Sequence, residues 1–563
     1  MKNTLILLSF ALVFANGCKT EVQYASNDFE SRVDSVFAEY NDIVKPGAAV
    51  AVVMNGEIVF QKGYGSANLE YDIPVTSSTI FHIASVSKQF TVFSILLLVE
   101  EGKLDFDDDI RKYIPEVPDF GKTISLRHLA SHTSGLRDQW NLLAMAGWRQ
   151  DDVITKEHVL KLVAKQKELN FEPGEAYTYC NTGFTLLAEV VSRVSGQSFA
   201  EFTKSRIFDP LQMTNTLFYD DHEKIVKNRA YSYHSDDLGF KKSVLSYANV
   251  GATSLFTTVE DLSLWAMNFG SPKVGNNEII NQLNTLATLN NGETFGGAHG
   301  QFVNKYRGLN QIQHGGADAG YRSYLGRFPD QNFAVSVFSN FASANTRGLA
   351  MRITDIFLED ALISESENKV EAAKYEKLSN EELEAFAGSY WNEAGSYSRK
   401  VFLKNDTLRY SRGEGNESLI VPIGNNIFDM LSVGVDSKVG FEIEKEQKTI
   451  IVTIDDGDTI ISKSYIPINY SKEQLQEFAG TFYSEELSTS YSFKIKNDTL
   501  TATHSRLNDI RINPIKKDMF FGDQWFFNNI KFERDNSNAI SGIRISNGRV
   551  KNLLFKKTAH NMR

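Results

Sequence analysis

Residues 81–90, FHIASVSKQF, contain the sharpest feature of this chain, a serine that stands three positions before a lysine. The next residues, 90–99, are apolar on nearly every helical face and the run stops at Gly102, so they predict a buried helix with a glycine cap. Ser85 and Lys88 open this helix, and a spacing of three residues places both side chains on one helical face. We therefore expect the serine and the lysine to lie side by side.

Ser85 is a candidate nucleophile and Lys88 is its candidate proton acceptor. A serine hydroxyl reacts poorly until a neighbour takes its proton, and the N–H groups at a helix start stabilise developing negative charge. The pKa of Lys88 must fall by about three units from ~10.4 for the amine to be neutral near pH 7, which needs burial or a second cation. A plain helix start is the alternative. Ser366 and Lys369 share the spacing but lie in a charged segment, so we interpret them as a chance match.

Three further motifs follow in the chain: LRHLASHTSGL at residues 126–136, EPGEAYTYCNTG at residues 172–183 and LFTTVEDL at residues 255–262. Together with residues 81–104 they resemble the penicillin-recognising serine hydrolases related to class C β-lactamases. That family contains β-lactamases, D,D-carboxypeptidases, D-aminopeptidases and esterases. The resemblance spans residues 30–360 and implies a β-lactamase/transpeptidase-like catalytic domain, an α/β (α+β) fold with an antiparallel sheet flanked by helices.

The residues themselves also favour a domain that mixes sheet and helix. Residues 48–53 run into an Asn-Gly pair and residues 57–61 return, which is typical of two strands joined by a tight turn. Residues 321–325 and 333–339 either alternate apolar and polar types or are rich in β-branched and aromatic types. Both patterns indicate adjacent strands of one sheet.

The second motif of the family, Tyr-x-Asn, falls on Tyr179 and Asn181. The resemblance implies that Tyr179 acts as a general base beside Lys88, since a nearby ammonium favours a phenolate. Which of the two takes the first proton stays open. For Asn181 the resemblance implies that it binds the substrate amide or holds Lys88. The alternative for Tyr179 is an aromatic side chain packed in the core. Residues 247–249 and 390–392 repeat the pattern, but the first lacks the flanking motif and the second lies in a repeat.

The third motif of the family is usually Lys-Thr-Gly, and this chain has His314, Gly315 and Gly316 instead. Glycines let a substrate lie against the edge of the strand, and the resemblance implies an oxyanion hole made by the N–H groups of Ser85 and Ala317. An imidazole is mostly neutral above pH ~6.5, so it recognises a substrate carboxylate less well than an ammonium does. The motif therefore disfavours efficient β-lactam hydrolysis.

Other residues have more ordinary interpretations. Arg322 is a candidate to restore the positive charge that His314 does not supply in the third motif, although an arginine near a strand is more often a surface side chain. The loop that holds His132 is structural in the family, so we expect a hydrogen-bonded support there, and we expect Cys180 to be a small buried filler. The ten histidines are scattered without metal-ligand spacing and no phosphate-cradling glycine loop occurs, so neither a metal nor a cofactor is predicted.

The N-terminus resembles an export signal. Residues 1–17 carry one lysine and an apolar run that is too short to cross a bilayer but typical of a signal peptide. Cys18 follows in a context similar to a bacterial lipoprotein cleavage site, where the cysteine becomes acylated, although Ala15 replaces the usual leucine. We expect an exported protein of the cell envelope, anchored to a periplasmic or outer membrane through Cys18. Cleavage after Ala15, which releases a soluble protein, is the alternative.

The C-terminal part of the chain contains an internal repeat. Residues 378–408 match residues 470–500 at an offset of 92, with fourteen of 31 positions identical. Each unit opens with a short helical segment and continues as short strands with Asn-Asp and Gly turns, which predicts two small antiparallel β-barrels of the lipocalin-like kind. The C-terminal part is therefore predicted to consist of a linker at residues 361–377, a first barrel at residues 378–467 and a second barrel at residues 468–563.

Composition and charge limit the function further. A chain of 563 residues is too long for one core, and its net charge of −11 offers no basic field, so nucleic acid is not an expected partner. We predict an exported serine hydrolase that forms an acyl-enzyme on Ser85 with a small-molecule or peptide substrate, which is a D-amino-acid peptide or amide, an ester or a β-lactam-like compound. The alternative is a non-hydrolytic receptor for peptidoglycan fragments or an envelope partner. The barrels either limit substrate size or serve as spacers or docking modules.

Overall fold

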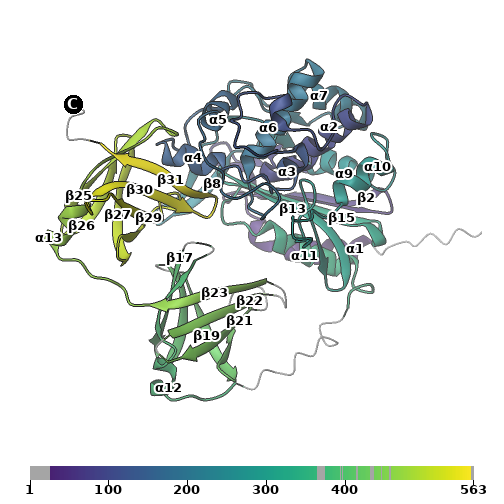
Figure 1. Ribbon diagram of the computed structural model, residues 1–563. Coiled ribbons are helices and arrows are strands. Elements are labelled where there is room, and N and C mark those ends of the chain that lie inside the picture. The colour runs from purple at the N-terminus through teal and green to yellow at the C-terminus, as the bar shows by residue number, and fades with distance from the viewer. Residues whose placement is uncertain are drawn as a thin grey trace, which may run out of the picture.

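The computed structural model describes residues 26–363 and 375–558, apart from residues 394, 396, 414–415, 432–436, 446 and 455–457. The predicted signal peptide, Cys18 and most of the predicted linker lie outside these residues. Figure 1 shows a helix-rich N-terminal domain, coloured purple to teal, with two barrels in green and yellow beside and below it. This domain holds the predicted catalytic residues and is named the catalytic domain for that prediction. No helix in the described part of the chain is long and apolar enough to span a membrane.

The catalytic domain is built on a six-stranded antiparallel sheet whose order differs from the order of the chain. The predicted hairpin is present, and Asn55 and Gly56 turn it with φ angles of 53° and 81°. The later strands pair with it, so that the two ends of the domain meet in one sheet. In sheet order the strands are β12 (Phe302–Tyr306), β13 (Leu309–Asp318), β14 (Tyr321–Phe328), β15 (Phe333–Ser339), β1 (Ala48–Met54) and β2 (Glu57–Tyr64).

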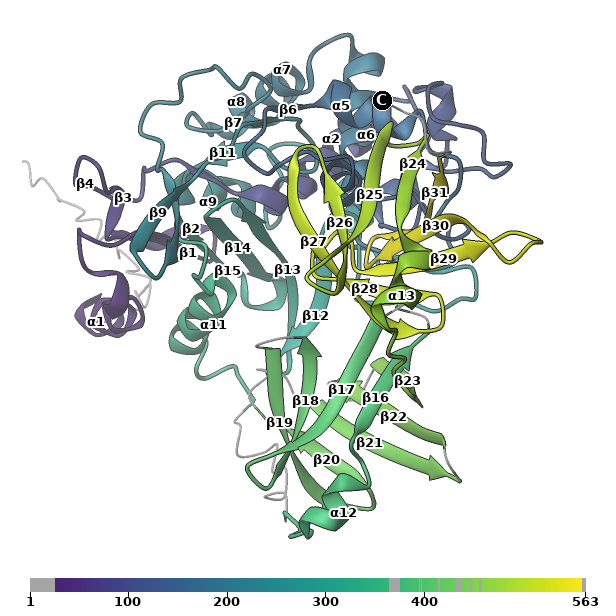
Figure 2. The same ribbon diagram turned by 90° about the vertical axis from the view of Figure 1, so that its left-hand side faces the viewer.

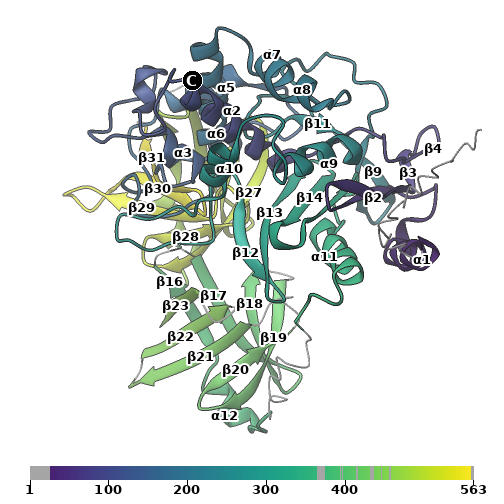
Figure 3. The same ribbon diagram turned by 90° about the vertical axis from the view of Figure 1, so that its right-hand side faces the viewer.

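Helices cover both faces of this sheet, and β1 is buried on both sides. Val50 and Val52 face a cluster with α1 and α11, whereas Ala49 and Ala51 face the larger cluster that contains α2, α6 and α9. Figure 2 shows α11 beside β15, and Figure 3 shows it beside β14. The helices are α1 (Ser26–Val36), α2 (Lys88–Glu100), α3 (Leu126–Ala130), α4 (Gln139–Met145), α5 (Lys156–Val163), α6 (Asn181–Ser195), α7 (Phe199–Thr203), α8 (Asp209–Leu211), α9 (Val259–Asn268), α10 (Asn277–Asn284) and α11 (Thr346–Phe357).

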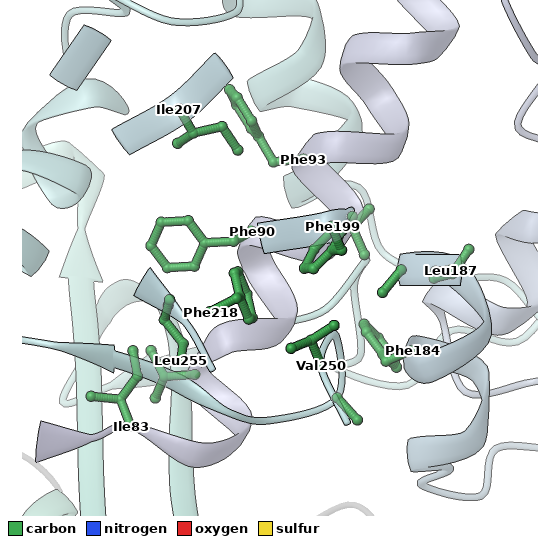
Figure 4. Packing of buried hydrophobic residues seen from close by; sticks show 14 of the residues in the cluster. Ile83, Phe90, Phe93, Phe184, Leu187, Phe199, Ile207, Phe218, Val250 and Leu255 are labelled. Carbon is green, nitrogen blue, oxygen red and sulfur yellow. The ribbon is translucent and has the colours of Figure 1, made fainter. Parts of the chain in front are cut away.

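The helix predicted from residues 90–99 is α2, and it is buried from Lys88 to Leu98. Phe90 and Phe93 of α2 pack with Phe184 and Leu187 of α6 in one apolar core (Figure 4). Because α2 is apolar all round, it is enclosed by other helices. This burial fixes the position of its first turn, which carries the candidate nucleophile.

The repeat forms two closed eight-stranded antiparallel barrels. The repeated Asn-Asp pairs turn equivalent hairpins, with φ angles of 52° and 56° at Asn405 and Asp406 and of 48° and 58° at Asn497 and Asp498. The first barrel follows α12 (Asn380–Glu384) and contains β16 (Gly388–Asn392), β17 (Tyr397–Lys404), β18 (Thr407–Gly413), β19 (Asn416–Gly424), β20 (Ile427–Met430), β21 (Ser437–Glu444), β22 (Gln447–Ile454) and β23 (Asp458–Tyr465). The second follows α13 (Lys472–Leu475) and contains β24 (Gly480–Ser484), β25 (Thr489–Lys496), β26 (Thr499–His504), β27 (Leu507–Lys516), β28 (Met519–Gly522), β29 (Asn529–Arg534), β30 (Ile540–Asn547) and β31 (Val550–Lys557).

The second barrel is docked on the catalytic domain. Leu142 and Met145 of α4 belong to the apolar core of this barrel, and the hydroxyl of Tyr491 donates to the carbonyl of Met145 at 2.9 Å. A buried ion pair joins Arg137 to Glu486 across the same contact. The first barrel in turn meets the second one where Lys516 lies over the ring of Trp391, 4.9 Å from its centre. The second barrel is therefore the one that is fixed next to the catalytic domain.

Candidate active site

Ser85 lies in a 3₁₀ turn, Ala84–Ser87, that leads directly into α2. Within residues 81–90 it is the one residue that is not buried, so its hydroxyl is accessible from a cavity. Ala84 before it has a φ angle of 47°, in the left-handed region that a non-glycine residue rarely adopts. Such local strain is typical of sites where the surrounding structure holds a functional side chain in place.

Lys88 is fully buried beneath Ser85, and its Nζ makes three hydrogen bonds. It lies 3.0 Å from Oγ of Ser85, 2.9 Å from Oδ1 of Asn181 and 2.7 Å from the carbonyl oxygen of Ala252. Burial lowers the pKa of Lys88 to about 7. The amine is thus a proton acceptor near neutral pH, which is the condition that the sequence required of it.

The carboxylate of Asp138 fixes the orientation of Asn181. Nδ2 of Asn181 donates to Oδ2 of Asp138 at 2.8 Å, and the backbone N–H of Asn181 donates to the same oxygen at 2.6 Å. An amide held by its nitrogen in this way must turn its oxygen toward Lys88. Asn181 therefore holds the lysine, which is one of the two roles expected for it, and Asp138 acts behind it.

Tyr179 lies beside Ser85 and Lys88. Its hydroxyl faces the same cavity as Ser85, and Nζ of Lys88 lies 5.0 Å from the centre of its ring. The ring stacks on His132 with centres 4.2 Å apart, and Nδ1 of His132 accepts from the backbone N–H of Cys180 at 3.0 Å. Burial raises the pKa of the Tyr179 phenol, while the nearby Ser85 hydroxyl and the charge of Arg549 lower it. His132 thus supports Tyr179.

The third motif forms the last part of β13, which passes the turn that holds Ser85. A Cβ atom on Gly316 would lie 2.3 Å from the carbonyl oxygen of Ile83, so only glycine fits there. The Nδ1–H of His314 donates to the carbonyl of Gly315 at 2.6 Å, and burial lowers the pKa of His314 to about 3. This imidazole is neutral, and its buried Nε2 has no partner within the described residues.

Charges on the cavity wall differ from those that the sequence suggested. The guanidinium of Arg322 donates to the carbonyls of Ala319 and Tyr321, and Arg322 is not among the residues that line the cavity. Asp318 lines it and accepts from the hydroxyl of Thr253, and burial raises the pKa of its carboxyl to about 6. The cavity obtains its positive charges from other parts of the chain.

The cavity in front of Ser85 measures about 650 Å³. Two arginines line it that the sequence did not single out, Arg347 of α11 and Arg549 of the second barrel. The site residues that the three family motifs imply all line the cavity except Lys88, which lies beneath its floor. The lining comprises Ser85, Trp140, Tyr177, Tyr179, Asn181, Thr253, Phe302, Gln313, His314, Gly315, Gly316, Ala317, Asp318, Ser323, Tyr324, Ala344, Asn345, Thr346, Arg347 and Arg549.

Comparison with known proteins agrees with this geometry. The family model described as Beta-lactamase matches residues 33–356, which is more than half of the chain. The chain belongs to the Beta-lactamase family. It is 28% identical over 321 residues to a D-aminopeptidase of Gluconobacter oxydans, a match that covers 57% of this chain and 60% of that relative. The chain thus spans about three fifths of the length of the curated relatives that it matches.

Solved structures share the fold of this Beta-lactamase family member. The octameric penicillin-binding protein homologue from Pyrococcus abyssi matches with a TM-score of 0.54 and 24% identity, over 78% of this chain and 100% of that chain. The D-amino acid amidase from Ochrobactrum anthropi SV3 matches with a TM-score of 0.51 and 21% identity, over 59% of this chain and 98% of that chain. At this level of identity the likeness concerns the architecture.

Asp138, Arg347 and Arg549 were not identified as site residues from the sequence. Asp138 also accepts from the backbone N–H of Trp140 at 3.0 Å and so caps α4, and an aspartate before a helical segment is a weak signal that could have marked it. Arg549 has no sequence signal, because only the docking of the second barrel brings it to a Beta-lactamase family site. No group of three His, Cys, Asp or Glu side chains in the described residues is arranged to hold a metal ion.

Proposed function

We propose that this protein is a serine hydrolase that cleaves amide or ester bonds through an acyl-enzyme on Ser85. The observation that carries the proposal is the hydrogen-bond geometry of Lys88. A neutral amine has two hydrogens and one lone pair. Asn181 and the carbonyl of Ala252 accept the two hydrogens, which leaves the lone pair facing Oγ of Ser85. Lys88 is thereby arranged to take the serine proton and is our choice for the first base.

In the acylation step, Oγ of Ser85 attacks the carbonyl carbon of the substrate while its proton passes to Nζ of Lys88. The carbonyl oxygen becomes an oxyanion, which the N–H groups of Ser85 and Ala317 are proposed to stabilise at the start of the helix and the edge of β13. The oxyanion then collapses and the bond to the leaving group breaks. Tyr179 gives its phenolic proton to the leaving nitrogen or oxygen, since its raised pKa keeps it protonated.

Deacylation reverses these proton transfers. The phenolate of Tyr179 takes a proton from a water molecule, and the resulting hydroxide attacks the acyl carbon. Oγ of Ser85 leaves and regains its proton from the ammonium of Lys88. The net reaction consumes one water and returns the three side chains to their starting states, so no cofactor is needed to balance it.

Amides of D-amino acids are the substrate class that we propose first. D-aminopeptidases are among the curated relatives, and the D-amino acid amidase shares the fold. Esters follow by the same chemistry. The neutral His314 in place of a lysine argues against efficient β-lactam hydrolysis.

A substrate panel tests this function. Purified protein and the Ser85→Ala variant are assayed with p-nitrophenyl esters, D-amino-acid amides, D-Ala-D-Ala peptides and a chromogenic cephalosporin. We expect turnover of amides and esters by the wild type and none by the variant. Turnover of the cephalosporin above all other substrates would contradict the argument from His314, and turnover by the Ser85→Ala variant would contradict the acyl-enzyme.

Export and anchoring through Cys18 are also part of our proposal. The apolar run within residues 1–17 and the position of Cys18 support it. In cells, the wild type should partition into the detergent phase and the Cys18→Ala variant into the aqueous phase. Equal partition of the two would show that Cys18 carries no anchor.

A further inference from the structure

A hairpin of the second barrel enters the active-site cavity. Strands β30 and β31 are joined by a turn at Gly548 and Arg549, and Arg549 lines the cavity together with Ser85 and Tyr179. This turn comes from a different domain, more than 450 residues after Ser85 in the chain. The composition of the cavity therefore depends on the docked barrel.

The backbone of this turn is held on both sides. The carbonyl oxygen of Arg549 accepts from Nδ2 of Asn170 at 2.9 Å and from the backbone N–H of Asp138 at 3.3 Å. Its own N–H donates to Oδ1 of Asn547 at 3.0 Å, and the same oxygen of Asn547 accepts from Nδ2 of Asn141 at 2.8 Å. The side chain of Arg549 thus projects from a fixed point, which lowers the entropic cost of binding a ligand.

The guanidinium of Arg549 lies over the ring of Tyr179, 4.9 Å from its centre. None of the ion pairs within the described residues includes Arg549, although the interface around it contains several. Across this interface Arg137 pairs with Glu486, and Arg544 pairs with Glu168. A half-buried guanidinium that faces a cavity without a carboxylate partner is arranged to receive an anion from outside the protein.

The other charged groups on the cavity wall do not compete for that role. Arg347 is exposed, so water and salt screen it more strongly than Arg549. His314 is neutral, and Lys88 lies beneath the floor with its hydrogen bonds occupied. Asp318 is the acidic member of the wall; it accepts from the hydroxyl of Thr253 and, among the described residues, makes no ion pair with Arg549. Arg549 is thus the half-buried cation beside Tyr179, the residue proposed to protonate the leaving nitrogen or oxygen of the substrate.

We propose that Arg549 binds a carboxylate on the leaving-group side of the substrate, so that the enzyme prefers peptides whose departing residue carries a free C-terminal carboxylate. The orientation of the substrate in this inference rests on the proposed function, in which Tyr179 gives its proton to the leaving nitrogen. Arg549 lies over Tyr179 and therefore on the leaving-group side. The planar fork of an arginine matches a carboxylate with two parallel hydrogen bonds. The second barrel then supplies the positive charge that the motif beginning at His314 lacks.

Binding to an inactive variant tests this inference apart from hydrolysis. On a Ser85→Ala background, titration calorimetry compares N-acetyl-D-Ala-D-Ala with its C-terminal carboxamide. We expect the acid to bind at least about tenfold more tightly, because hydrogen bonds to charged groups are the stronger ones. Adding Arg549→Gln should remove that preference, and Arg549→Lys should retain part of it. Equal affinities of acid and carboxamide in the parent, or weak binding of both, would overturn the inference.

Arg544→Gln is the matched control. Arg544 lies on the same hairpin and makes an ion pair across the interface with Glu168, but it is not among the cavity residues. The Arg544→Gln variant should keep the preference for the acid. Loss of the preference in this variant would mean that barrel docking causes it, which would overturn the role of Arg549. In the active protein, the ratio of kcat/KM for the two peptides should fall at least about tenfold in Arg549→Gln. An unchanged ratio contradicts the inference, whereas a lack of hydrolysis of any substrate contradicts only the proposed function.

Discussion

Oδ1 of Asn181 lies 2.9 Å from Nζ of Lys88, at the end of a chain of contacts that begins at the buried carboxylate of Asp138. Each member of this chain constrains the next one. Asp138 fixes the amide of Asn181, the amide fixes the amine, and the amine faces Oγ of Ser85 at 3.0 Å. The reactivity of the serine thus depends on a residue that does not touch it.

Removal of the amine should abolish catalysis without unfolding the protein. We expect Lys88→Met to lower kcat by about 10²- to 10⁴-fold, which is the usual contribution of a general base. Lys88→Arg should lose as much, because a guanidinium does not give up its proton in proteins. Steady-state kinetics measures the loss and circular dichroism checks the fold. Activity of Lys88→Arg within tenfold of the wild type would mean that Lys88 is not the base.

The rate should depend on pH through Lys88. Burial lowers the pKa of Lys88 to about 7, and the active form is the unprotonated amine, so kcat/KM should rise with pH through a midpoint near 7. The carboxylate of Asp318 raises the pKa of Lys88, so Asp318→Asn should move the midpoint to lower pH. A midpoint that moves to higher pH in Asp318→Asn would contradict the assignment of Lys88 as the base. A wild-type midpoint far above pH 7 would also contradict it, because it would point to a phenolate of Tyr179 as the base.

Asp138 should act as a positioning residue. Asp138→Asn replaces the carboxylate that accepts from Nδ2 of Asn181 with a side-chain amide. The side chain of Asn181 is then free to turn its nitrogen toward Lys88. We expect kcat to fall by about 10- to 100-fold, with the pH midpoint shifted down because the carboxylate of Asp138 raises the pKa of Lys88. Unfolding curves serve as the control for stability. A loss of stability with an unchanged pH profile would leave Asp138 a purely structural role.

The ion pair between Arg137 and Glu486 should hold the second barrel in place. Their side chains are 0% and 6% exposed, and Nη1 of Arg137 lies 2.5 Å from Oε2 of Glu486. Glu486→Gln removes the buried counter-charge of Arg137 and leaves only the half-exposed Glu168, whose Oε2 lies 3.6 Å from Nη2. We therefore expect a cost of up to about 3–5 kcal/mol. Urea unfolding should show this loss, and activity should fall because the hairpin with Arg549 is displaced. A change below about 1 kcal/mol would mean that the apolar contact of α4 alone holds the barrel.

Gly316 and Gly315 offer a matched pair of substitutions on β13. A Cβ at position 316 meets the carbonyl oxygen of Ile83 at 2.3 Å, whereas at position 315 the nearest atom is 3.8 Å away. Gly316→Ala should therefore push β13 away from the turn of Ser85 and destabilise the fold by about 1–3 kcal/mol, with a large loss of kcat. Gly315→Ala should fold normally. Equal effects of the two substitutions on stability would contradict the close approach of β13 to that turn.

The elements that could be predicted from the sequence are those with a local pattern. The hairpin around Asn55 and Gly56, the buried helix α2 and the two barrels are confirmed, because turn chemistry, apolar runs and the repeat are all visible within short windows. Ser85 and Lys88 belong to this group, since one turn of helix joins them. Their contact follows from the spacing alone.

The rest of the site depends on contacts between distant segments. Arg549 reaches the cavity only because α4 shares an apolar core with the second barrel, and no motif marks such a contact. Arg322 was a reasonable candidate by distance along the chain, and it does lie in β14 opposite Ala317. Its guanidinium, however, donates to the carbonyls of Ala319 and Tyr321 and does not line the cavity. The fall in the pKa of Lys88 likewise comes from burial among side chains of several segments.

Labelling with a fluorophosphonate, followed by intact-protein and peptide mass spectrometry, shows whether Ser85 is the nucleophile. We expect one adduct per chain, located on Ser85, that forms faster as the pH rises through 7. The adduct should be absent in Ser85→Ala and should form much more slowly in Lys88→Met. An unlabelled wild-type protein, or an adduct on another residue, would contradict the assignment of Ser85 as the nucleophile.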